Sequence, residues 1–317
     1  MPTFKAGEYF NNVLTLNRAL DERNEQFHDT RPHAPADSPE AKADTAIWMG
    51  CNVLRTPHIA RLAIEIMRLL NPKLSVLGGP LHCCGSPIPD ADERASSLQS
   101  AVAGFRAENV PQLVSWCPSC HTNLRKGSDP SQWGFDELHV TEYLFQRLDR
   151  LPLRHAVPMR VMLHGHTGAP DRDKDMLCCR RLLEAVPGLT IVGEHSDPQL
   201  GLHCVPMALA PVIGEDGYER RFKEVLERAY QAGAEAVATI YHSCYRELER
   251  RTEPGRVGVE NYIVILARAL GIDVPRNLYR EFAHGTGQER DAIKAAAAAG
   301  GVNEEHLDSA LGAEFPK

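Results

Sequence analysis

The sequence lacks the features of a secreted or membrane-spanning chain. Its first eight residues have neither the basic region nor the apolar core of a signal peptide, and no apolar run reaches the ~18 residues that a transmembrane helix needs. The 35 basic and 42 acidic side chains are interspersed, so no patch of one sign predicts binding to nucleic acid or to an anionic membrane. We therefore expect a cytoplasmic protein with no nucleic-acid partner and no membrane span.

A framework of disulfide bonds is not indicated either. The 317-residue chain has nine cysteines, an odd number, and no export signal, which favours reduced or metal-bound thiols. The pattern C-x31-CC-x32-C-x2-C defines a five-cysteine group: Cys51, Cys83, Cys84, Cys117 and Cys120.

Five thiols exceed the four ligands of a tetrahedral zinc ion, and they suit an iron–sulfur cluster, whose irons take thiolate as their usual protein ligand. The alternative is a thioredoxin-like redox pair at Cys117 and Cys120, with Cys83 and Cys84 as small buried hydrophobes. Because cysteines at such spacings in a cytosolic chain point to metal or catalysis, we predict a cluster.

The hydrophobic pattern alternates between short apolar runs and helical periodicity. Strands are predicted at 45–49, 74–77 and 113–116, and helices at 59–70 and 95–108. Each cysteine of the five-cysteine group follows a predicted strand, and parallel sheets collect ligands beyond the carboxyl ends of their strands. The pattern predicts an α/β fold in which the cysteines converge at one sheet edge.

The second half of the chain repeats the first. Gly201-Leu202-His203-Cys204 resembles Pro80-Leu81-His82-Cys83, and Ile240-Tyr241-His242-Ser243-Cys244 resembles Trp116-Cys117-Pro118-Ser119-Cys120. Such self-similarity indicates two related lobes, each a small, mostly parallel sheet flanked by helices. The expected divisions are an N-terminal extension or linker with a short helix near 9–23 (1–44), a first lobe (45–155), a second lobe (156–275) and a partly helical tail (276–317).

The cysteine spacing, the duplication and the segment Trp48-Met49-Gly50-Cys51 resemble the cysteine-rich CCG-domain proteins, most closely the CCG-domain component of heterodisulfide reductase, over about residues 45–272. The resemblance implies that the five-cysteine group binds one non-cubane 4Fe–4S cluster. It also implies two partner proteins, one flavin-containing and one ferredoxin-like, and a sulfur-containing small molecule or carrier protein as substrate. The bacterial sulfur-oxidising complexes of this type fit best, because only one motif is complete.

The second lobe departs from the family pattern, since at most two of its cysteines, Cys204 and Cys244, occupy family positions. Three interpretations stay open: a decayed structural lobe, a reactive Cys204/Cys244 pair or substrate pocket, and a mixed metal site, such as zinc. The candidate ligands of that site are His164, His166, His203, Cys204 and Cys244. Cys178 and Cys179 form an extra pair in a helical stretch, and helix packing and a role in this site are both consistent with their position.

The leading hypothesis is thus an oxidoreductase subunit that transfers electrons in thiol, disulfide or sulfur-compound chemistry. Its rivals are a non-catalytic electron-relay or assembly scaffold and a zinc-stabilised structural module. Only the first requires a sulfur compound to bind near the cluster.

Overall fold

The computed structural model describes residues 5–23, 43–196, 200–253 and 255–316. It divides into two compact units, the first formed by residues 1–140 with 275–317 and the second by residues 141–274. The proline-rich stretch at 28–39, assigned from sequence to an N-terminal linker, lies outside the described residues.

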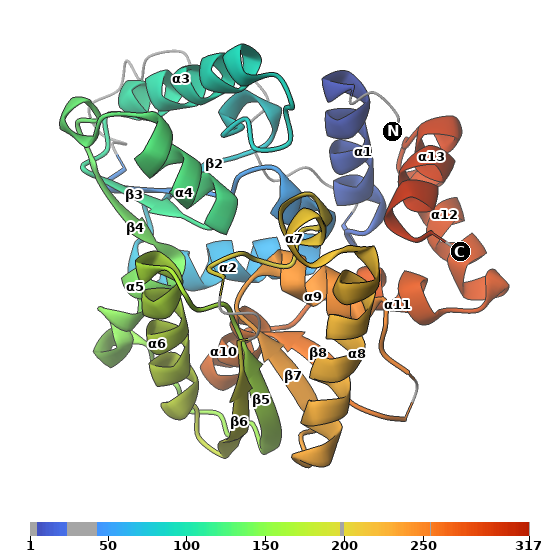
Figure 1. Ribbon diagram of the computed structural model, residues 1–317. Helices are drawn as coiled ribbons and strands as arrows, with labels where there is room; N and C mark the ends of the chain where they lie inside the picture. Colours follow the sequence, from blue (N-terminus) through green and yellow to red (C-terminus); the bar gives the residue numbers. More distant parts are fainter. Residues whose placement is uncertain (1–4, 24–42, 197–199, 254, 317) are drawn as a thin grey trace. The chain divides into compact units, whose positions relative to one another are not determined.

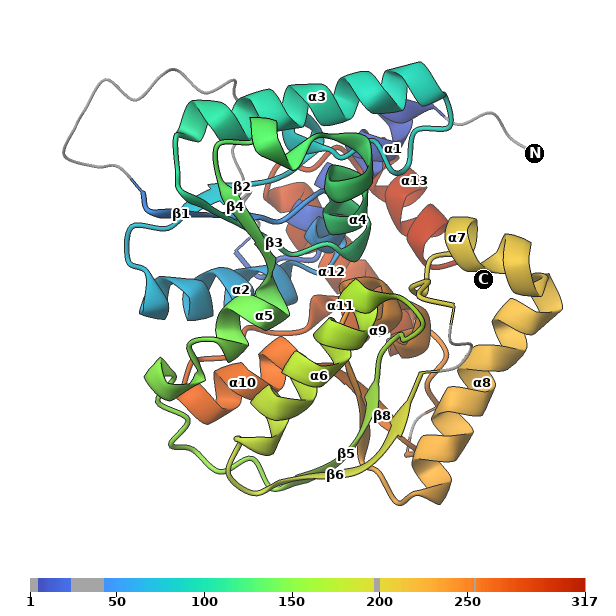
Figure 2. The same ribbon diagram turned by 60° about the vertical axis from the view of Figure 1, so that its left-hand side comes forward.

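The first unit contains a four-stranded parallel sheet with strand order β2-β1-β3-β4. Its strands are β1 (Thr45–Trp48), β2 (Ser75–Leu77), β3 (Gln112–Ser115) and β4 (Asp136–His139). Helix α2 (Pro57–Leu70) covers one face, and α3 (Ala91–Glu108) and α4 (Pro118–Gly127) cover the other, as Figure 1 and Figure 2 show. The 3-10 turns are η2 (Asn52–Arg55), η3 (Pro80–His82) and η4 (Pro130–Gln132).

Local sequence explains these elements. All four residues of β1 are buried, as expected of a central parallel strand covered on both faces. In α2, Ile59, Leu62 and Ile66 recur at helical spacing and are fully buried, which stabilises the unit by about 1.5–3 kcal/mol per side chain. Helix α3 begins after Asp90, whose carboxylate accepts hydrogen bonds from the backbone N–H groups of residues 92 and 93.

Segments from both chain ends complete the first unit. Helix α1 (Ala6–Ala19) packs against α12 (Gly287–Ala299) and α13 (Glu304–Glu314), which follow α11 (Leu278–His284). Arg18 donates a hydrogen bond to the carbonyl oxygen of Gly300 at 2.6 Å. Helix α1 comes from the segment assigned to an N-terminal extension, and α11 to α13 come from the segment assigned to a tail.

The second unit repeats this topology, with strand order β6-β5-β7-β8 and all strands parallel. Its strands are β5 (Met159–His164), β6 (Leu189–His195), β7 (Ala236–Thr239) and β8 (Gly258–Asn261). Helices α6 (Pro170–Glu184) and α10 (Tyr262–Leu270) lie together on one side of the sheet, and α8 (Glu215–Gln231) lies on the other (Figure 1). The remaining elements are α5 (Val140–Phe145), η5 (Leu148–Arg150), α7 (Pro206–Ile213) and α9 (His242–Glu249).

The predicted fold class is confirmed: the described residues form two all-parallel sheets flanked by helices. The three strands predicted in the first half lie within one residue of β1, β2 and β3. The helices predicted at 59–70 and 95–108 lie within α2 and α3, which begin two and four residues earlier. Among the described helices, none combines the length and apolar character needed to cross a membrane.

Candidate metal centres

The five-cysteine group lies at the carboxyl edge of the first sheet. Cys51 follows β1, Cys83 and Cys84 follow β2 through η3, and Cys117 and Cys120 follow β3. Strand order reverses between β1 and β3, the position where doubly wound sheets bind ligands. Cys117 caps α4 and Cys120 lies in its first turn, so both thiols are close to the positive end of the helix dipole.

The five side chains are at most 6% exposed, and their sulfur atoms interact with one another. A hydrogen bond with Cys83, followed by burial, raises the pKa of the Cys51 thiol well above its usual value. Hydrogen bonds from the Cys120 and Cys83 thiols lower the pKa of Cys84 to about 6, despite its burial. The structure therefore brings together the cysteines that the sequence singles out, as mutually interacting thiols.

Two glycines with positive φ lie beside this group. Gly50 has φ +69°, and a Cβ atom there would lie 2.9 Å from Cys120 Sγ and 3.2 Å from Cys117 Cβ. Gly85 has φ +77° and donates its N–H to Cys83 Sγ at 3.3 Å. Backbone donors to cysteine sulfur and a space that a methyl group would fill are both consistent with an iron–sulfur cluster.

Polar contacts hold the loops that carry the cysteines. Trp48 Nε1 donates to the carbonyl oxygen of His82 at 2.7 Å, next to Cys83. Asn123 Nδ2 lies 3.4 Å from the carbonyl oxygen of Cys84 and 3.7 Å from its sulfur. Tyr9 Oη, on α1, lies 3.7 Å from Cys51 Sγ. These contacts orient the loops that carry the group.

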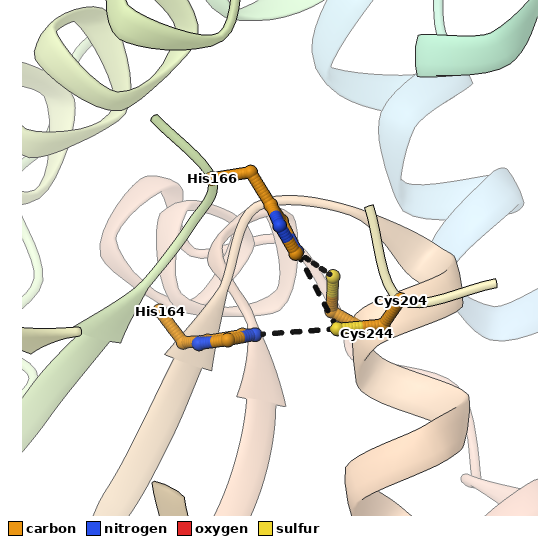
Figure 3. A group of neighbouring side chains, drawn as sticks. All are labelled: His164, His166, Cys204 and Cys244. Atoms are coloured by element: carbon orange, nitrogen blue, oxygen red, sulfur yellow. Dashed lines mark hydrogen bonds between the residues drawn. The ribbon is translucent and has the colours of Figure 1, made fainter. Parts of the chain in front are cut away.

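The second unit has a histidine–cysteine group: His164, His166, Cys204 and Cys244. Its four ligand atoms all lie within 4.8 Å of one another, and all four side chains are fully buried (Figure 3). His166 Nε2 lies 3.2 Å from Cys244 Sγ and 3.4 Å from Cys204 Sγ, and His164 Nε2 lies 3.4 Å from Cys204 Sγ. The donors come from the end of β5, the segment before α7 and the first turn of α9.

A third histidine and the buried charged side chains Arg221 and Glu247 lie near this group. His195 Nδ1, at the end of β6, lies 3.4 Å from His164 Nδ1. Burial raises the pKa of the Cys204 thiol well above its usual value, and Cys244 adds to this, whereas the charge of Arg221 opposes it. Burial would also raise the pKa of Cys244, but the Cys204 thiol and both imidazoles lower it well below its usual value.

His203, the fifth residue predicted for this site, is not among the four. Its ring lies edge-on to Tyr241, with centroids 6.4 Å apart. Burial, followed by the charge of Arg172, lowers its pKa to about 3. Cys178 and Cys179 are buried in α6, and burial raises the pKa of Cys178 to about 11.

Sequence reasoning missed three residues that shape these centres: Gly50, His195 and Arg221. Gly50 stands directly before Cys51, and a glycine next to a ligand is a signal of close approach. His195 ends a strand, as His164 does, so strand-end histidines could have revealed it. Arg221 lies inside a charged amphipathic helix, and no sequence pattern around it indicates a position beside a metal site.

Comparison with known proteins supports a metal-binding role for the first unit. The model of the cysteine-rich domain, CCG, matches residues 45–125, a range that contains the five-cysteine group. No curated protein matches the chain.

Two solved structures are weakly similar. An aspartate racemase homologue from Pyrococcus horikoshii is 15% identical with a TM-score of 0.32, over 72% of this chain and 97% of that chain. A 5-methylthioribose transporter solute binding protein from Thermotoga lettingae is 12% identical with a TM-score of 0.26, over 82% of each chain. These scores are too low to support an argument about function.

Proposed function

We propose that the protein is the iron–sulfur subunit of a heterodisulfide-reductase-like complex, with one non-cubane 4Fe–4S cluster bound by Cys51, Cys83, Cys84, Cys117 and Cys120. The observation that carries the proposal is the convergence of five buried, interacting thiols at the switch point of a sheet inside a cysteine-rich domain. A tetrahedral ion would leave one of these sulfurs without a metal bond, whereas a polynuclear cluster has sites for all of them.

The bound cluster would supply electrons one at a time. Cleavage of a disulfide consumes two electrons and two protons and yields two thiols, so it divides into two one-electron steps. The chain contributes the thiolate ligands, the positive end of α4 and the N–H of Gly85, each of which stabilises negative charge on sulfur. The substrate would be a disulfide or a related sulfur compound, free or on a carrier protein.

The ligand set is tested by replacing Cys83 or Cys84 with alanine in anaerobically purified protein. We expect loss or strong alteration of iron, acid-labile sulfide and visible absorption, because the cluster depends on both thiolates. Cys178→Ala and Cys179→Ala are matched controls, since this second buried Cys-Cys pair lies in α6 of the other unit. Unchanged iron and spectrum in both test variants would refute the assignment.

The role in catalysis is tested separately. A catalytic protein, once reduced, should be reoxidised by a small disulfide such as glutathione disulfide or by a sulfane-sulfur compound, in the absence of partners. A relay would respond only to a flavin-containing or a ferredoxin-like partner protein. Co-purification with such partners would support the complex, and a reduced protein inert to all of them would argue against it.

A further inference from the structure

We propose that the second unit binds one Zn²⁺ ion through His164, His166, Cys204 and Cys244 as a closed structural site. The site is separate from the proposed cluster, because its ligands belong to another unit and include none of the five-cysteine group. It therefore stands or falls independently of the proposed function.

The geometry matches a single tetrahedral ion. With Zn–S distances near 2.3 Å and Zn–N distances near 2.0–2.1 Å, tetrahedral ligands place nitrogen and sulfur about 3.6 Å apart. The observed N···S distances are 3.2, 3.4 and 3.4 Å, and all four donors fall within 4.8 Å. A Rieske-type cluster fits less well, because its histidines and cysteines bind different irons and lie on opposite sides of the cluster.

The donor set also favours zinc. Two thiolates and two imidazoles form the Cys₂His₂ combination of structural zinc sites, and tetrahedral sulfur–nitrogen sites select zinc over harder cations. The two thiolates neutralise the charge of the ion. The four side chains are 0% exposed, so no coordination position faces solvent, and the site is closed in the manner of a structural centre.

The residues around the four ligands resemble the outer shell of a metal site, which orients the ligands through hydrogen bonds. The Nδ1 atoms of His164 and His195 are 3.4 Å apart, so His164 can donate Nδ1–H to His195 while its Nε2 faces Cys204. Arg221 is 4% exposed, and none of its guanidinium nitrogens has a hydrogen-bond partner among the described residues. This buried cation lies near Cys204 and His166.

The ion would connect three segments that are distant in sequence. His164 is the last residue of β5, and His166 follows it two residues later. Cys204 precedes α7, and Cys244 lies in α9. Binding energy at such a site is folding energy, since the unfolded chain does not hold the four donors together. Zinc would thus stabilise the edge of the second sheet that corresponds to the cluster edge of the first.

The test is elemental analysis of the full-length chain, purified anaerobically, with four variants. We expect about one zinc per chain in the wild type and in Cys179→Ala, and less than about one tenth of that in Cys204→Ala and Cys244→Ala. Cys83→Ala shows whether zinc occupies the five-cysteine group instead, and it should retain full zinc. Iron should be unchanged in the Cys204 and Cys244 variants.

A second measurement needs no variant and does not depend on variant folding. Wild-type protein depleted with a chelator and supplied with Co²⁺ should develop the intense visible bands of tetrahedral sulfur-ligated cobalt, and Zn²⁺ should abolish them. Zinc that persists in both variants, iron in place of zinc at these residues, or a metal-free wild type with Cys204 and Cys244 reactive toward thiol reagents would each overturn the proposal.

Discussion

Replacing Gly50 with alanine should remove iron from the protein, and the structure allows the effect to be divided into two parts. At φ +69°, any non-glycine residue costs about 1–2 kcal/mol of backbone strain. The new Cβ would also lie 2.9 Å from Cys120 Sγ, inside the 3.4 Å at which ordinary contact begins. Overpacking of this kind costs a further 1–3 kcal/mol or so. We expect a total loss of roughly 2–5 kcal/mol in the free energy of unfolding.

The contact matters more for the metal than for the fold. To relieve it, Cys120 Sγ must move by about half an ångström, more than the roughly 0.2 Å tolerance of metal–ligand distances. Iron per chain and visible absorption should therefore fall in Gly50→Ala. The stability loss is measured by urea unfolding of metal-free protein, kept anaerobic and reduced.

Gly134 provides a matched control, because its φ is +75° and a Cβ atom there would meet nothing within 4 Å. Gly134→Ala should lose only the strain energy of about 1–2 kcal/mol and keep all its iron. If Gly50→Ala keeps the wild-type iron content and loses no more stability than Gly134→Ala, then the space in front of Gly50 is not needed by a cluster, and the reasoning fails.

Three further predictions concern the buried polar groups and thiols. Asp175 in α6 accepts hydrogen bonds from Tyr241 and Thr141 and pairs with the buried Arg172. Urea unfolding of Asp175→Ala should therefore show a free energy of unfolding lower by about 3–5 kcal/mol. The control Glu184→Ala, which removes an exposed ion pair with Arg181, should lose less than about 1 kcal/mol. Burial, with the charge of Arg280, lowers the pKa of His58 from 6.5 to about 3, so between these pH values the unfolded state binds more protons than the folded state. The free energy of unfolding should therefore be about 1.4 kcal/mol lower at pH 5.5 than well above pH 6.5. His58→Gln should remove this part of the pH dependence, and a pH dependence equal to that of the wild type would contradict the prediction. Burial raises the pKa of Cys178 and Cys179, so neither thiol should be alkylated by iodoacetamide at neutral pH until the protein unfolds, as peptide mass spectrometry would report.

The strands and the first-unit centre are readable from sequence because their signals are local. Short apolar runs end at Trp48, Leu77 and Ser115, and each is followed within six residues by a cysteine. Parallel pairing then brings the strand ends together without any knowledge of side-chain conformations. Once the strands are identified, the convergence of the five-cysteine group follows from topology.

The rest depends on contacts that a single sequence does not contain. The hydrogen bond between Arg18 and Gly300 joins residues 282 positions apart, so the place of α1 could not be predicted from its composition. In the second unit, His203 and Cys204 are adjacent in sequence, yet only Cys204 belongs to the histidine–cysteine group. The backbone conformation before α7 decides which of the two side chains joins the group, and this segment has no hydrophobic periodicity from which its conformation could be predicted.

The two units share a register that explains how their ligand sets differ. Trp48 pairs with Ser115 in the first sheet, and His164 pairs with Thr239 in the second. Ser115 lies five residues before Cys120, and Thr239 lies five residues before Cys244. Cys120 and Cys244 are each the third residue of a helix, α4 and α9. By the same alignment, Tyr241 stands in the place of Cys117, and its hydroxyl donates to Asp175 at 2.6 Å. A buried hydrogen-bonded pair thus occupies a position that carries a sulfur in the first unit.

The same register aligns Gly50 with His166, so the two proposed centres differ at this position. At Gly50 the absence of a side chain leaves the approach to Cys120 open, and a single methyl group there would contact the sulfur at 2.9 Å. At His166 an imidazole fills the corresponding approach, and its Nε2 lies 3.2 Å from Cys244 Sγ. An imidazole in that position supplies a nitrogen donor close to the distance from sulfur that a single tetrahedral ion requires. The two proposals thus place a sulfur-rich cluster and a four-coordinate metal on related units, and the glycine or histidine two positions after the last residue of the first strand is one of the substitutions that separate them, with Tyr241 in place of Cys117 another.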